Sequence, residues 1–139
     1  MDPHSSQTPL TPSEVAEAVE LDRRFIDAMN RKDLEAAVAC FWDHPDVVLV
    51  AFGKVLRGIE AVRRYTAELF AQNESIRIET KNVTYRQAGD GVVGAGTAVF
   101  HLQTPAGSPR LMIECWSDLR RKIDGRWVYV LDHAAPGEA

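Results

Sequence analysis

Residues 122–135, KIDGRWVYVLDHAA, carry the clearest local structural signal in the chain. Asp124-Gly125 is a dipeptide that favours a two-residue hairpin turn, and the apolar residues around it favour two antiparallel strands. A turn of this length fixes which residues pair across the hairpin. It predicts that Ser117 faces Asp132 and that Arg120 faces Tyr129.

Before this hairpin, toward the N-terminus, apolar and polar residues continue to alternate with a period of two. Alternating apolar residues predict strands over 76–87, 92–104 and 110–123, before the last strand over 126–134. The turn over 105–108 is expected to pair Phe100 with Ile113. These strands form an antiparallel meander.

The N-terminal half has the helical period instead. Thr11, Pro12 and Glu14 have the spacing of a capping box with proline at the first helical position. Asp33 is expected to cap a second helix that ends near residue 44, and a third helix is expected over 58–72. A valine-rich run over 46–52 predicts a buried strand. Helices followed by a meander predict one α+β domain.

Composition narrows the function classes. The 139 residues include 45% hydrophobic residues and carry a net charge of −4, with no basic run. This argues against binding to nucleic acid or an anionic membrane surface. No apolar stretch is long enough to span a membrane, and two cysteines are too few for a disulfide scaffold. We expect a cytoplasmic protein with no metal and no cofactor, a disordered arm over 1–11 and a short tail over 136–139.

The predicted register divides the sheet into two faces. One face would be covered by the helices and would hold small residues around Ser117 and Asp132, which leaves room for an apolar cavity. The other would carry several large apolar side chains and is interpreted as the interface of a homodimer. The side chains expected in that interface are Trp116, Trp127, Tyr129, Met112 and Leu131.

Asp132 is the candidate catalytic residue, because a carboxyl group among apolar neighbours has a raised pKa suited to proton transfer. The other residues expected to contribute to a ligand pocket are Phe25, Trp42, Tyr65, Cys115, Ser117 and His133. For His133 two positions stay open, one facing the cavity and one at the dimer interface.

Three segments resemble the NTF2-like superfamily and its SnoaL-like and ketosteroid-isomerase-like branches. They are the helix junction FIDAMNRKDLEAAVACF (25–41), the strand and helix start DVVLVAFGKVLRGIEAV (46–62), and the closing hairpin KIDGRWVYVLDHAA. The resemblance covers residues 12–135 and implies a cone in which three helices pack on a curved antiparallel sheet.

The resemblance does not carry steroid-isomerase chemistry with it. At the positions where isomerase members place a tyrosine and two aspartates, this chain has Phe25, Ala51 and Ser117. The resemblance to the NTF2-like superfamily implies a protein that binds a small ligand in an apolar cavity. One interpretation is a cofactor-independent isomerase, cyclase or dehydratase acting on a small apolar metabolite. The other is a non-catalytic module for ligand binding, dimerisation or association.

Overall fold

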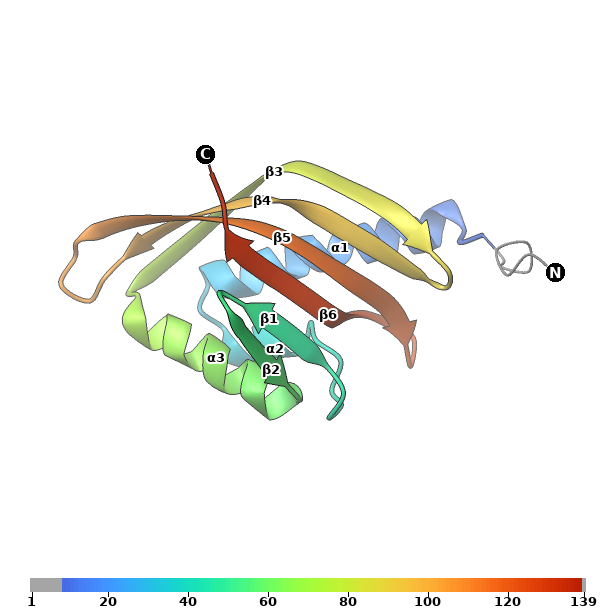
Figure 1. Cartoon of the computed structure of the whole chain (residues 1–139), viewed down its shortest axis with the longest axis horizontal. Coiled ribbons are helices and arrows are strands. Elements are labelled where there is room, and N and C mark those ends of the chain that lie inside the picture. The colour runs from blue at the N-terminus through green and yellow to red at the C-terminus, as the bar shows by residue number, and fades with distance from the viewer. Residues whose placement is uncertain (1–8, 139) are drawn as a thin grey trace.

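The computed structural model describes residues 9–138 and shows three helices and a long, curved sheet, two strands of which precede the third helix (Figure 1). The helices are α1 (Pro12–Asn30), α2 (Leu34–Val38) and α3 (Ile59–Gln72). The strands are β1 (Val48–Ala51), β2 (Lys54–Arg57), β3 (Ser75–Ala88), β4 (Gly91–Gln103), β5 (Pro109–Ile123) and β6 (Arg126–Pro136). The α+β cone is confirmed.

Both predicted helix caps are present. Thr11 Oγ1 accepts the backbone N–H of Glu14 at 3.1 Å, and Glu14 Oε1 accepts the backbone N–H of Thr11 at 3.0 Å. Asp33 accepts from the backbone N–H of Ala36. The second helix is shorter than expected and ends at Val38 rather than near residue 44.

The ends of the chain carry their own contacts. Residues 1–8 of the expected N-terminal arm lie outside the described residues, whereas Leu10 donates its backbone N–H to Gln87 Oε1 at 3.1 Å. At the other end β6 reaches Pro136, and Gly137 donates to the backbone carbonyl of Ile113 at 2.9 Å.

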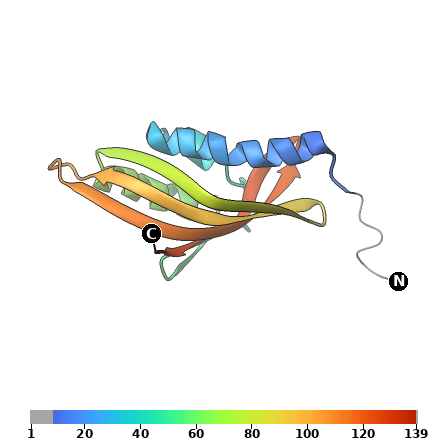
Figure 2. The same ribbon diagram turned by 90° about the horizontal axis from the view of Figure 1, so that it is seen from above.

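The six strands are ordered β2-β1-β6-β5-β4-β3. All neighbours are antiparallel except β1 and β6, which run parallel. Strand β2 was not predicted: a tight turn at Phe52 and Gly53, both with positive φ, folds it back on β1. In the view from above, α1 runs along one face of the sheet (Figure 2).

The predicted register is wrong over the part of the sheet that forms the cone. Arg120 pairs with Tyr129 as expected, but a β-bulge follows on β6. Beyond the bulge Asp118, rather than Ser117, faces Asp132. Between β4 and β5 the unpaired loop has an odd number of residues, so Phe100 pairs with Met112 and not with Ile113.

A shift of one residue moves every side chain of β5 to the other face. Trp116 and Met112 therefore pack against a core cluster, and Trp127 and Tyr129 are buried in the core. Four of the five residues expected at the dimer interface thus lie inside, and Leu131, 42% exposed, is the remaining one on the outer face.

The core consists of two apolar clusters that meet at Phe25 of α1. One joins α1 to Phe41 and Tyr129, and the other joins α1 to Phe100 and the first half of β3. The ring of Phe25 contacts those of Phe41 and Tyr129 edge-on, with centroids 5.7 and 5.6 Å apart. None of the described helices is both long enough and apolar enough to cross a membrane.

Candidate functional site

Two adjoining pockets lie between the helices and the sheet. They share Phe25, Phe100, Glu114 and Asp132 as lining residues. The first extends toward Trp116 on the sheet and the second toward α3. Since the same four side chains line both, we treat them as one site, the cone pocket.

The cone pocket is small. The room for the centre of a water molecule is about 50 Å³ in the first part and about 60 Å³ in the second. One buried water needs roughly 10–15 Å³ on this measure. Each part therefore has space for a few water molecules or for a small organic group.

Glu114 and Asp132 are the polar centre of this pocket, and we call them the open pair. Glu114 comes from β5 and Asp132 from the neighbouring β6, and both side chains are partly buried. Across residues 9–138, neither carboxyl group forms an ion pair or a hydrogen bond to another side chain. A buried carboxyl group without a partner is costly as an anion.

Burial accordingly favours the neutral form of both acids. It raises the pKa of Glu114 to about 7, so this group is close to half ionised at neutral pH. Burial also raises the pKa of Asp132 well above its usual range, and the negative charges of Asp118 and Glu114 add to the effect. The open pair thus combines Asp132, whose pKa is shifted in favour of the protonated form, with Glu114, which exchanges its proton near neutral pH.

Tyr65 of α3 lies against the same two acids and lines the second part of the pocket. Burial raises the pKa of Tyr65 to about 12, and the charges of Glu114 and Asp132 contribute. Its hydroxyl therefore stays protonated and is a hydrogen-bond donor at neutral pH.

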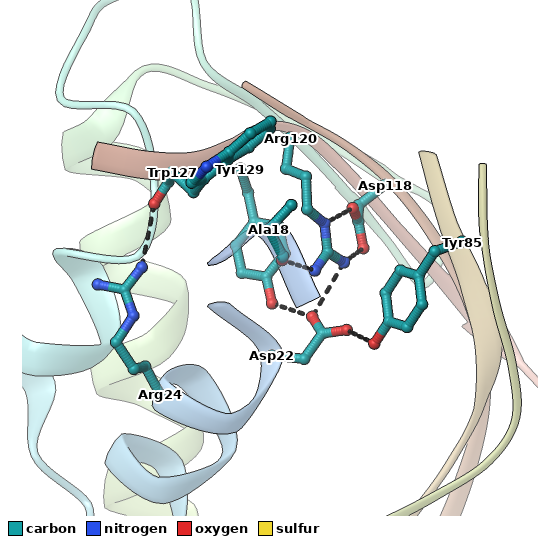
Figure 3. A network of polar contacts seen from close by, with 8 residues as sticks. All are labelled: Ala18, Asp22, Arg24, Tyr85, Asp118, Arg120, Trp127 and Tyr129. Carbon is teal, nitrogen blue, oxygen red and sulfur yellow. Dashed lines mark hydrogen bonds and ion pairs between the residues drawn. The ribbon is translucent and has the colours of Figure 1, made fainter. Parts of the chain in front are cut away.

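A second group of acids, Asp22 and Asp118, also lines the first part of the cone pocket but is fully paired (Figure 3). Arg120, completely buried, donates Nε to Asp118 Oδ1 at 2.9 Å and Nη2 to Asp118 Oδ2 at 2.7 Å. Its Nη1 donates to the carbonyl oxygen of Ala18 at 2.8 Å, and Nη2 lies 3.0 Å from Asp22 Oδ1.

Two tyrosines complete this arrangement, which we call the closed cluster: Asp22, Tyr85, Asp118, Arg120 and Tyr129. Tyr85 donates its hydroxyl to Asp22 Oδ2 at 2.5 Å, and Tyr129 donates to Asp22 Oδ1. Both rings also flank the guanidinium carbon, with centroids 5.2 and 5.1 Å away. Burial raises the pKa of Asp118 to about 6 while Arg120 opposes the rise, so Asp118 is ionised at neutral pH.

Glycines on β4 make the room for these large side chains. A Cβ atom at Gly94 would lie 2.7 Å from Arg120 Nη2, and one at Gly96 would lie 2.9 Å from Trp116 Cζ2. These small residues do not leave the cavity that their size predicts, because the large side chains of the neighbouring strand β5 fill much of the space.

The structure separates the residues predicted for the ligand pocket. Phe25, Tyr65 and Asp132 line the cone pocket. Trp42 does not: it packs against the core cluster of Phe41 and Tyr129, and its ring stacks on His44, with centroids 3.9 Å apart. Cys115 is exposed, and Ser117 and His133 line a hollow on the outer face. The one-residue register shift of β5 explains the position of Cys115 and Ser117, whereas His133 lies on the outer face, one of the two positions expected for it.

Glu114 is the site residue that sequence reasoning missed. The predicted register placed it on the outer face, where an acid is unremarkable. The signal that could have revealed it is the length of the loop between β4 and β5, since an odd number of unpaired residues puts Ala98 opposite Glu114. Among the described residues, no group of three or more His, Cys, Asp or Glu side chains is placed to hold a metal ion.

Comparisons with known proteins agree with the fold. The family model of the SnoaL-like domain matches residues 23–130. A search of curated proteins found no match.

Among solved structures, a candidate dehydratase of the NTF2-like family from Streptomyces avermitilis is 22% identical. That alignment covers 93% of this chain and 100% of the other, with a TM-score of 0.83. An NTF2-like superfamily protein from Salmonella enterica serovar Typhimurium is 15% identical over 93% and 95% of the two chains, with a TM-score of 0.83. A protein of unknown function from Mycobacterium tuberculosis is 25% identical over 93% and 79%, with a TM-score of 0.79.

Proposed function

Because the chain belongs to the SnoaL-like domain family, we propose that its cone pocket binds a small, mostly apolar molecule and transfers protons on it without a cofactor. The observation that carries this proposal is the open pair. Glu114 and Asp132 face one pocket without a countercharge, while Arg120, the cation whose charge acts on Asp132, is occupied by Asp118, Asp22 and Ala18.

The two acids have complementary roles in this proposal. Glu114, with a pKa of about 7, removes a proton from a carbon next to a carbonyl group or leaving group. Asp132, whose raised pKa favours its protonated form, donates a hydrogen bond to the oxygen on which negative charge develops, and the Tyr65 hydroxyl is a second donor.

This arrangement fits two reaction outcomes. Glu114 returns the proton to another carbon in an isomerisation or cyclisation. In a dehydration, Asp132 gives its proton to the departing hydroxyl, which leaves as water. The similarity to a candidate dehydratase from Streptomyces avermitilis supports the second outcome as one member of this class.

Proton abstraction can be tested before the natural substrate is known. Small ketones such as cyclohexanone exchange the hydrogens next to the carbonyl for deuterium in D₂O, and NMR measures the rate. We expect the protein to accelerate this exchange and Glu114→Gln to reduce the acceleration by roughly 10²–10⁴-fold, the usual contribution of a general base. Asp132→Asn should lower it as well.

Glu68→Gln, an exposed change on α3, is the matched control and should leave the rate unchanged. Loss of exchange only in the two pocket variants supports the enzyme. If the ketones stabilise the protein against heat but exchange is never accelerated, the chain is a ligand-binding module, which is the alternative function.

We also propose that the chain forms a homodimer through the outer face of the sheet, with a different set of residues from that expected. Leu111, Leu131 and Val93 are 58%, 42% and 39% exposed on this face, and the strands between them carry the small uncharged residues Ala95 and Ser117. Exposed apolar side chains on one face are typical of interfaces, and this face suits a second copy of the same surface. Light scattering should give twice the chain mass, and Leu131→Asp should give one chain mass. A wild-type monomer would contradict the proposal.

A further inference from the structure

A second concave site lies outside the cone, between α1, α2 and the beginning of β6. We call it the guanidinium hollow. It is lined by Arg23, Arg24, Asp27, Arg31, Ala36, Ala39, Cys40 and Arg126. Four arginines around one hollow are unexpected on a chain whose net charge is −4.

The acids near this hollow neutralise only two of its four arginines. Asp27 pairs with Arg31 at 3.0 Å, and Glu20 pairs with Arg23. Throughout the described part of the chain, Arg24 and Arg126 have no carboxylate partner. The hollow therefore holds two guanidinium groups whose charges are uncompensated.

Both of these arginines are exposed, and each is anchored by a hydrogen bond to a backbone carbonyl oxygen. Arg24 Nη2 donates to the carbonyl oxygen of Trp127 at 3.2 Å, as Figure 3 shows, and Arg126 Nη2 donates to that of Ala39 at 2.7 Å. A guanidinium group has five N–H donors, so each arginine keeps most of its donors for another partner.

Cys40 provides an independent sign that the two charges converge. Burial raises the pKa of its thiol to about 11, and Arg24 and Arg126 are the two charges that oppose this rise. Both guanidinium groups therefore act on one point at the floor of the hollow, although they come from α1 and β6.

We propose that the guanidinium hollow binds a phosphate monoester, with Arg24 and Arg126 as its principal ligands. The planar donor fork of arginine matches the oxygen spacing of phosphate, and a dianion balances two uncompensated cations, whereas a carboxylate balances one. The phosphate group can belong to a free small molecule or to a phosphorylated side chain, and the same two arginines would hold it in either case.

The test is an NMR titration of the arginine side-chain N–H signals with inorganic phosphate and with phenyl phosphate, at constant ionic strength. We expect saturable shifts of Arg24 and Arg126 and at least tenfold weaker binding of acetate. Arg24→Gln and Arg126→Gln should each weaken phosphate binding about tenfold. Arg64→Gln, an exposed arginine on α3, is the matched control and should leave the affinity unchanged.

A further arm separates the two sources of phosphate. A phosphoserine peptide that binds at least tenfold more tightly than phenyl phosphate identifies a phosphorylated protein, and equal affinities identify a free phosphate compound. The proposal is overturned if phosphate shifts all arginines alike, if acetate binds as tightly, or if neither glutamine variant weakens binding. Arg24→Lys and Arg126→Lys keep the charge and should retain part of the affinity.

Discussion

The cone contains two groups of acids, one paired with a cation and one without a countercharge. In the closed cluster, Asp22 and Asp118 are bonded to Arg120 and, for Asp22, to two tyrosine hydroxyls. In the open pair, Glu114 and Asp132 meet an apolar pocket with no countercharge. Asp118 and Asp132 even face each other across the same pair of strands.

The difference teaches which acids stabilise the fold and which are available for chemistry. The carboxylates of the closed cluster accept hydrogen bonds from a cation and two phenols, which leaves little capacity for a ligand. The open pair lacks such partners, so burial raises the pKa of both acids, and neighbouring negative charges add to the rise at Asp132. The predictions below compare the two groups directly, from the largest expected effect to the smallest.

Removal of the cation should damage the closed cluster most. Arg120→Met leaves Asp22 and Asp118 buried without their partner, and breaking a buried pair in this way costs about 3–5 kcal/mol. Urea unfolding followed by circular dichroism measures the loss. Arg64→Met, on an exposed position of α3, is the control and should change the free energy of unfolding by less than about 0.5 kcal/mol. Equal effects of the two variants would show that the cluster does not hold the fold.

Because of the open pair, the free energy of unfolding should depend on pH. The folded state raises the pKa of Glu114 from 4.5 to about 7, so folding favours the protonated form. The stability from this group is fully present below pH 4.5 and is lost as the pH rises through 7. At about 1.4 kcal/mol for each unit of pKa, the loss is on the order of 3 kcal/mol.

Glu114→Gln removes this dependence, so the variant should be more stable than the wild type at pH 8 and not at pH 4. Urea unfolding at a series of pH values gives both curves. Parallel curves for the two proteins would mean that Glu114 is not buried in the way described.

Tyrosine-to-phenylalanine changes compare the two groups at a single hydroxyl. Tyr85→Phe removes a hydrogen bond to the Asp22 carboxylate, which should cost about 1.5–3 kcal/mol. Tyr65→Phe removes a hydroxyl that forms no hydrogen bond within the described residues, so it should cost much less. Thermal unfolding of both variants makes the comparison. A larger loss of stability for Tyr65→Phe than for Tyr85→Phe would contradict the assignment of Tyr85 to the closed cluster and of Tyr65 to the open pocket.

The smallest effect expected is that of one added methyl group. Gly94→Ala places a Cβ 2.7 Å from Arg120 Nη2, and overpacking of this kind costs about 1–3 kcal/mol. Ala95→Ser, on the opposite face of the same strand, should cost less than about 0.5 kcal/mol. If Gly94→Ala is equally harmless, the closed cluster is not packed tightly against β4.

The sequence predicted the architecture better than the site, and the reason is physical. Helix caps at Thr11 and Asp33 and the turn at Asp124-Gly125 depend on residues close in the chain, and all three are present. The faces of β5 depend on parity, and one bulge or one extra loop residue reverses it.

Asp132 faces the cone pocket even so, because the bulge on β6 and the odd loop shift β5 and leave Asp132 on the inner side. Ser117, the neighbour expected for Asp132, lies on the outer face instead, and Glu114 lines the pocket. The local sequence does not predict the parallel pairing of β1 with β6 either, because this pairing joins segments about 80 residues apart. Long-range pairing, not local propensity, decides which acids share the pocket.

The most direct test of this account is a pH titration of the side-chain carboxyl carbons by ¹³C NMR. The account predicts that the Glu114 carboxyl carbon titrates near pH 7 and that the pKa of Asp132 lies well above its usual range, while Asp118 is ionised at neutral pH. If Glu114 and Asp132 instead titrate near 4.5 and 3.8, the values usual for exposed acids, the open pair is solvated and the proposed proton transfer loses its basis.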